Sequence, residues 1–203
     1  MSSLTSGVII GEVTDNKDPD KLARVKVKFL MQEGEEVSDW ARIAVPMAGK
    51  DRGTLFIPEV GDQVLLAFKL GEVSEPYIIG ALWTKDATPP EADYEKNNIR
   101  TIKSRSGHVI TFLDNEKEGS ITIKSGKGHN VVIDDKADKI TVSDDKAKNT
   151  IVIQGGDSGS ITVTSGSTAK ITLKGSGDIE INGSNSVKIV ATSKMDIESS
   201  GMM

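Results

Sequence analysis

The chain has 203 residues, of which 36% are hydrophobic and 4% aromatic, and its formal net charge is −5 at pH 7. This length allows one or two domains, but so few aromatic residues give little material for an ordinary globular core. The absence of cysteine excludes disulfides and thiolate zinc sites. The first residues lack the basic and apolar segments of a signal peptide, and no apolar run is long enough to span a bilayer, so we expect a protein made and kept in the cytosol.

The two halves of the sequence differ in composition. Seven of the eight aromatic residues lie before position 100. The first 99 residues contain 17 acidic and 11 basic residues, whereas the remainder contains 13 and 14. Residues 85–99 are polar, contain two prolines and show no apolar periodicity, as is typical of a linker. We therefore predict a first domain at residues 1–84, a linker at 85–99 and a second domain at 100–203.

Five short apolar segments bounded by turn-forming residues predict five strands in the first half. In the second segment Val25, Val27 and Phe29 alternate with lysines, which predicts one buried and one wet face. Five short antiparallel strands with long loops are typical of a small closed barrel, most often of the OB type. The predicted strands are residues 7–13, 24–30, 40–46, 63–68 and 77–83.

A three-residue motif of apolar, mostly polar and apolar residues recurs nine times in the second half, at spacings of 8 to 11 residues. One copy buries about two aliphatic side chains, worth roughly 1.5–3 kcal/mol each. Ordering its eight to ten residues costs roughly 1–2 kcal/mol per residue, so a single chain wound this thinly is not stable. We therefore predict an all-β protein whose second domain is a triple-stranded, intertwined homotrimeric β-helix. The predicted trimer core consists of Ile121, Ile123, Val131, Ile133, Ile140, Val142, Ile151, Ile153, Ile161, Val163, Ile171, Leu173, Ile179, Ile181, Val187, Ile189, Met195 and Ile197.

Candidate metal ligands are sparse. His108 and His129 stand beside glycines in polar segments, without a second histidine at ligand spacing. The acidic pairs at 134–135 and 144–145 fall between strands of the repeat, where turn formers are expected. The segment 155–159 only partly matches a calcium-binding β-roll, and regular Ile and Val spacing argues against a disordered tail. We predict no metal site.

Candidate catalytic residues are equally weak. The carboxylates of Glu59, Asp62, Glu72 and Glu75 lie near predicted turns and are read as turn formers rather than as a glycosidase pair. No nucleophile, nucleotide-binding or cofactor motif occurs, so we predict no catalytic residue, no cofactor and no enzyme activity. A barrel could bind nucleic acid, but the basic stripe at 24–28 is short, the domain is acidic, and its aromatic residues fall mainly at apolar positions of predicted strands, which suit the core.

The string PEVGDQVLLAF at 58–68, with EPYIIGALW at 75–83, resembles the barrel of phage baseplate assembly protein V and the VgrG spike family. Segments 40–42, 46–49 and 7–11 match the same barrel. In that family a triple-stranded β-helix follows the barrel, and the 8-residue spacing of the last copies resembles its octad repeat.

The resemblance implies a structural, trimeric central spike of the baseplate of a contractile tail, which pierces the target cell envelope on sheath contraction. The particle would be a phage, a phage-tail-like bacteriocin or a related injection system. Some spikes carry a lysozyme domain after the barrel, and VgrG proteins carry a hub domain before it; neither is expected here, so the hub would be a separate protein. The apolar end at Met202 and Met203 predicts contact with a tip cap of the PAAR-repeat type. The alternatives are a trimeric tail fibre and an OB-fold nucleic-acid-binding protein.

Overall fold

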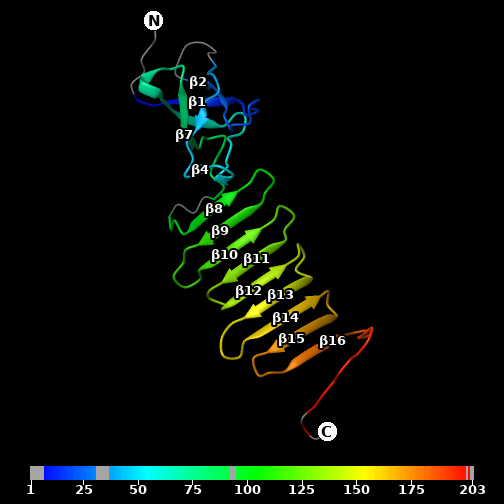
Figure 1. The fold of residues 1–203 in the computed structure, drawn as a ribbon. Helices are drawn as coiled ribbons and strands as arrows, with labels where there is room; N and C mark the ends of the chain where they lie inside the picture. Colours follow the sequence, from blue (N-terminus) through cyan, green and yellow to red (C-terminus); the bar gives the residue numbers. More distant parts are fainter. Residues whose placement is uncertain (1–6, 31–36, 92–94, 200, 202–203) are drawn as a thin grey trace. The chain divides into compact units, whose positions relative to one another are not determined.

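The computed structural model describes residues 7–30, 37–91, 95–199 and 201. The chain divides into two compact units, Met1–Pro89 and Pro90–Met203. Strands make up almost all of the regular structure, and the described residues contain one helical element, the 3-10 turn η1 at Lys69–Gly71 (Figure 1). No helix in these described ranges is long and apolar enough to cross a bilayer. The all-β class predicted from the sequence is confirmed.

Unit 1 is built on a five-stranded sheet in the order β2-β1-β6-β7-β3. All pairs are antiparallel except β3 with β7, which are parallel. Val25, before β2, exchanges two backbone hydrogen bonds with Ala41, before β3 (3.1 and 2.8 Å), so the two outer strands of the sheet also meet. This closes the sheet into a small barrel. The strands are β1 (Ile9–Asp15), β2 (Lys26–Phe29), β3 (Arg42–Ile43), β6 (Gln63–Phe68) and β7 (Pro76–Leu82).

The barrel interior is filled by side chains that alternate along the strands, as the pleat requires. Val25, Val27 and Phe29 are buried, so the predicted inward face of this segment is confirmed. The Phe29 ring meets the edge of Phe68 with 6.0 Å between the ring centroids. The buried hydrophobic residues are Val13, Val25, Val27, Phe29, Ala41, Val64, Leu66 and Ile78.

The structure differs from the sequence prediction at two places in unit 1. The predicted strand at 40–46 shrinks to Arg42–Ile43, and the chain then forms a short hairpin of β4 (Ala48–Gly49) and β5 (Arg52–Gly53). Trp83 was read as a core residue but is 67% exposed, so that interpretation is wrong. It follows the end of β7, where the alternation of a strand no longer dictates which face is buried.

Unit 2 is a nine-stranded antiparallel sheet in which every strand pairs with its neighbours in sequence (Figure 1). Turns of three to six residues connect the strands, and several contain glycines with positive φ. The strands are β8 (Ile99–Lys103), β9 (Val109–Leu113), β10 (Ser120–Lys124), β11 (Asn130–Asp134), β12 (Lys139–Ser143), β13 (Asn149–Gln154), β14 (Ser160–Ser165), β15 (Ala169–Lys174) and β16 (Ile179–Gly183).

The first seven copies of the repeated motif coincide with β10–β16, which confirms that they are strands. The last two copies, beginning at Val187 and Met195, form no strand among the described residues after Gly183. The predicted intertwined β-helix requires strand edges to pair with partner chains. From β9 to β15, both edges of each strand are instead paired within the same chain, because connections this short favour hairpins.

Candidate assembly interface

The register of the sheet in unit 2 aligns the repeated motifs into columns. In an antiparallel pair the first residue of one motif lies opposite the third residue of the next, as in Ile121 opposite Ile133 and Ile123 opposite Val131. The same pairing continues through every hairpin to Leu173 opposite Ile179. Because alternate residues of a strand share a face, the outer residues of all motifs lie on one face. The sheet therefore carries two parallel columns of aliphatic side chains.

These columns remain open to solvent in the single chain. Their exposed fractions run from 37% for Ile121 to 69% for Ile179, and only Val131 falls in the half-buried range. Soluble proteins rarely leave a contiguous apolar surface of this extent uncovered. This apolar face is therefore the most conspicuous candidate for a functional surface in unit 2.

The opposite face has a different chemistry. Its middle column carries threonine or valine at most positions, as in Thr162 opposite Thr172, and ends with Thr172 opposite Glu180. In the first strands of the sheet, the Oγ1 atoms of Thr101 and Thr111 lie 3.3 Å apart. The flanking columns include lysine, serine and asparagine, such as Lys124 opposite Asn130. This face is the polar one, although its middle column is largely half-buried and Thr172 is 6% exposed, so the sheet is amphipathic.

Hydrogen bonds and ion pairs at the turns fix the register of the columns. The Asp144 carboxylate accepts backbone N–H groups from Lys146, Lys148 and Asn149 and a bond from the Asn149 side-chain amide. Desolvation raises the pKa of Asp144, but these hydrogen bonds together outweigh it and leave the pKa below its usual value. At a neighbouring turn, Lys136 pairs with Glu118. The acidic residues thus build turns, as their sequence context suggested.

The two histidines occupy equivalent positions in two turns of the sheet. The Oγ atoms of Ser104 and Ser125 accept the backbone N–H groups of His108 and His129, at 3.0 and 3.1 Å. Nδ1 of His108 accepts the N–H of Gly126 at 3.2 Å, so this nitrogen is already used. Within the described part of the chain, no group of three histidine or carboxylate side chains is placed to hold a metal ion.

The carboxylates considered as a catalytic pair act locally in unit 1. The Asp62 side chain accepts the N–H of Glu59 at 2.8 Å, and Glu75 pairs with Lys69 at 2.8 Å. The pKa of Lys69 is raised because its ammonium group donates a hydrogen bond to Glu75. These contacts give the carboxylates turn-building roles.

The basic stripe considered for nucleic acid has partners within the chain. Arg24 binds Asp18 and Asp20, and the Lys26 ammonium lies 5.3 Å from the centre of the Trp40 ring. Two aspartates thus neutralise Arg24, the first cation of the stripe, which weakens the case for a nucleic-acid groove.

The apolar face also contains residues that the sequence analysis missed. Ile110 and Phe112 on β9 lie opposite Ile123 and Ile121, and Ile102 on β8 lies opposite Ile110. Their alternation matches the repeated motif, but Phe112 replaces the aliphatic residue and hid the resemblance. Among the predicted core residues, those from Ile121 to Ile181 lie in the two columns. Val187, Ile189, Met195 and Ile197 follow the last strand, and Met202 and Met203 lie outside the described residues.

Comparison with known proteins places unit 1 in a family. Residues 9–83 match the model of the Type VI secretion system/phage-baseplate injector OB domain. The chain is 28% identical to the Type VI secretion system spike protein VgrG1a of Pseudomonas aeruginosa over 114 residues. This alignment covers 53% of this chain and 18% of VgrG1a. Type VI secretion system spike protein VgrG3 of Vibrio cholerae is 31% identical over 94 residues, 43% of this chain and 9% of that protein. Actin cross-linking toxin VgrG1 of Vibrio cholerae is 32% identical over 75 residues, 35% of this chain and 7% of that protein.

The chain thus matches less than a fifth of the length of these relatives. The match to VgrG1a covers more residues than unit 1 contains, so it extends into unit 2. The five-stranded barrel, the matched domain and the spike-protein relatives agree with one another. Residues 9–83 thus match an injector OB domain, and the chain is similar to VgrG-type spike proteins over about half of its length.

Proposed function

We propose that this protein is the trimeric central spike of the baseplate of a contractile tail or related injection system, and that it pierces the target cell envelope mechanically. The observation that carries the proposal is the apolar face of unit 2, two aliphatic columns that no described residue of the chain covers. The membership of unit 1 in the injector family supports the same reading. The spike role of the relatives is extended to this chain as part of the proposal.

Assembly through the apolar face has a simple energetic basis. Moving one half-exposed aliphatic side chain into a core contributes about 1 kcal/mol to the free energy of association. Each protein chain supplies two columns of such side chains. Three narrow sheets around one axis would enclose all columns in a single core and leave the threonine-rich faces in water. For the copies that begin at Val187 and Met195, we propose pairing with partner chains, which gives the triple-stranded, intertwined β-helix. The assembled needle would span residues 100–203, joined to the barrel of 1–84 by the linker 85–99.

A closed trimeric needle suits a mechanical task. Force along its axis would load many backbone hydrogen bonds together, and no exposed strand edge would remain along its sides. The barrel would seat the needle on a separate hub protein of the baseplate. In this role the chain needs no enzyme activity, cofactor or bound metal. It would be assembled in the bacterial cytoplasm, as part of the tail or tail-like particle.

The first test is the mass of the purified full-length protein by light scattering, beside a truncation that ends near residue 90. Three copies of the 21.7 kDa chain give about 65 kDa. We expect this mass for the full chain and a lower mass for the truncation, because the truncation lacks the apolar face. A dimer would point to two sheets packed face to face, and a monomer would refute the trimeric needle.

A second part of the proposal concerns the far end of the needle. We propose that Met202 and Met203 of three copies form an apolar platform for a tip cap of the PAAR-repeat type. The test removes these two residues and asks whether a cap protein remains in purified particles. Retention of the cap at its normal amount would refute this part and leave the trimeric needle standing.

A further inference from the structure

An apolar groove of about 500 Å³ opens on unit 1 beside the β4–β5 hairpin. Its lining includes Met47, Leu55 and Phe56, which are 52%, 73% and 66% exposed. Leu22, 65% exposed, lines it from another loop. Exposed apolar side chains that converge on one hollow mark a binding surface rather than chance exposure.

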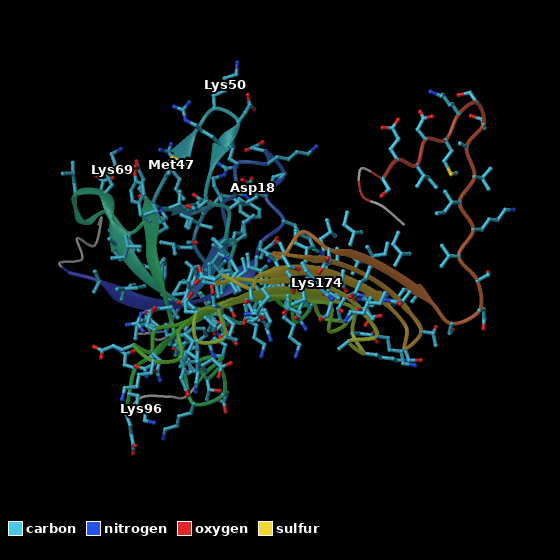
Figure 2. All side chains as sticks on the ribbon, turned by 90° about the horizontal axis from the view of Figure 1, so that it is seen from below. Asp18, Met47, Lys50, Lys69, Lys96 and Lys174 are labelled. Carbon is cyan, nitrogen blue, oxygen red and sulfur yellow. The ribbon has the colours of Figure 1, made fainter. Side chains whose placement is uncertain are left out.

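The walls of the groove are held in place by local structure. On one side, the nearly buried Asp18 carboxylate accepts the N–H of Leu22 at 2.9 Å and binds the Arg24 guanidinium at 2.7 Å. On the other side, Gly53 has φ +147°, and a Cβ there would lie 2.5 Å from the carbonyl oxygen of Met47. This close approach requires a glycine where the two strands of the hairpin meet; in Figure 2 the hairpin projects from the barrel with Lys50 at its tip. The groove is therefore preformed, which lowers the entropic cost of binding.

Two arginines line the groove, and their guanidinium groups favour an occupant that can stack on them. Arg42 and Arg52 both contribute to its wall, and neither forms an ion pair with any residue that the structure describes. An apolar pocket with free guanidinium groups suits an aromatic side chain, because arginine stacks on the face of an indole or phenol ring. Tryptophan and arginine are also the residues most enriched at the centres of protein interfaces.

Unit 1 contains an exposed aromatic side chain of this kind. Trp83 follows β7, is 67% exposed and is not part of the groove wall of its own chain. Because β3 and β7 run parallel, with Ile43 opposite Ile78, the chain leading from β3 to Met47 extends toward the end of the sheet where Trp83 lies. The tryptophan and the groove are therefore at the same end of the barrel, from which the chain leads into unit 2.

We infer that Trp83 of one copy inserts into the groove of the next copy, where its ring lies against Leu55 and Phe56 and stacks on Arg52 or Arg42. The inference rests on the proposed trimer. A contact between two different patches is heterologous, and repeated around an axis it closes a ring. Three barrels joined in this way would hold the three chains together where they enter the needle. The interface adds to the apolar face of unit 2 and does not replace it.

The test uses the fact that the chain contains only two tryptophans, Trp40 and Trp83. In the full-length Trp40→Phe variant, the fluorescence reports on Trp83 alone, and light scattering on the same sample gives the mass. We expect a trimer with blue-shifted emission and quenching by acrylamide several-fold weaker than for free N-acetyltryptophanamide. Adding Leu55→Glu should return Trp83 to full quenching. The matched control is Val60→Glu, because Val60 is 60% exposed but does not line the groove.

The outcomes separate this inference from the proposed function. A trimer in which Trp83 is quenched as strongly as the free amide would refute the inference and leave the spike standing. A trimer in which Leu55→Glu has no more effect than Val60→Glu would refute the groove as the binding site. A monomer would refute both, and a monomer with protected Trp83 would show that the tryptophan enters the groove of its own chain.

A second measurement does not depend on fluorescence. The chain has no cysteine, so a Trp83→Cys, Leu55→Cys variant can be joined only at the two introduced positions. A short bismaleimide should link neighbouring copies into covalent trimers on a denaturing gel. Each single-cysteine variant should give no covalent trimer, and a Trp83→Cys, Val60→Cys pair should give far less. Only monomers from the first pair, in a sample shown to be trimeric, would contradict the inference.

Discussion

Ile121 on β10 lies directly opposite Ile133 on β11, yet the two side chains are 37% and 39% exposed. A cross-strand pair of isoleucines normally contributes to a core. Here the pair is one step in an apolar column that crosses eight strands, from Phe112 on β9 to Ile179 on β16, without a covering layer in the described chain. From β9 to β15 the strands are thus hydrogen-bonded on both edges, whereas their apolar face has no packing partner among the described residues.

A charge placed in the column should disrupt assembly. We expect Ile153→Glu to convert the full-length trimer into monomers or to lower its stability by several kcal/mol, since an unpaired carboxylate would be buried in each copy. Light scattering and thermal unfolding check this. Lys170→Glu is the matched control, because Lys170 is exposed and lies on the opposite face, two residues before Thr172 on β15. Equal effects from both substitutions would show that the apolar face is not the buried one.

The β4–β5 hairpin should depend on a single glycine. Gly53→Ala would place a methyl group 2.5 Å from the Met47 carbonyl oxygen at a φ of +147°. We expect a destabilisation of about 1–3 kcal/mol, measured from the urea midpoint of unfolding. Gly80→Ala is the control, because a Cβ at Gly80 meets no atom within 4 Å. An unchanged midpoint for Gly53→Ala would mean that the hairpin does not contribute to stability.

The Asp18–Arg24 pair should make unit 1 sensitive to acid. The hydrogen bond from Arg24 is the largest cause holding the pKa of Asp18 well below its usual value. An aspartate in the unfolded chain titrates near pH 3.9, about its ordinary value. A depressed folded-state pKa therefore contributes stability above about pH 4, which is lost as the pH falls toward the folded-state pKa.

We accordingly expect Asp18→Asn to lower the stability at neutral pH and to reduce its loss between about pH 5 and pH 3. Urea unfolding across this pH range measures both effects. The exposed Asp51 provides the control, through Asp51→Asn. If Asp18→Asn retained the full acid dependence of the parent protein, the pair would not be its source.

Much of the fold could be predicted from alternation alone. The spacing of Val25, Val27 and Phe29 predicted one buried face, and the motif at Ile121 and its repeats predicted strands with both aliphatic positions on one side. The pairing partners could not be predicted in the same way. An apolar-polar-apolar motif reads identically whether the next strand belongs to the same chain or to another.

The exposed groove could not be predicted from the sequence for a different reason. Met47, Leu55 and Phe56 are apolar residues on connecting segments. Such segments have no periodicity that distinguishes a buried apolar side chain from an exposed one. Trp83 ends a strand pattern and was read as core for that reason. Only the hairpin held by Gly53 and the loop held by Asp18 bring these side chains around one hollow.

Because the strands β8–β16 pair in the order of the sequence, they can also fold in that order. Because each strand needs only the strand before it, loop closure is short at every step and the sheet can grow while the chain leaves the ribosome. The two aliphatic columns lengthen with each added hairpin and reach full extent only with β16. In the proposed trimer, association of chains would therefore be favoured late in synthesis, when the whole apolar face is available, and contacts between unfinished chains would be weaker.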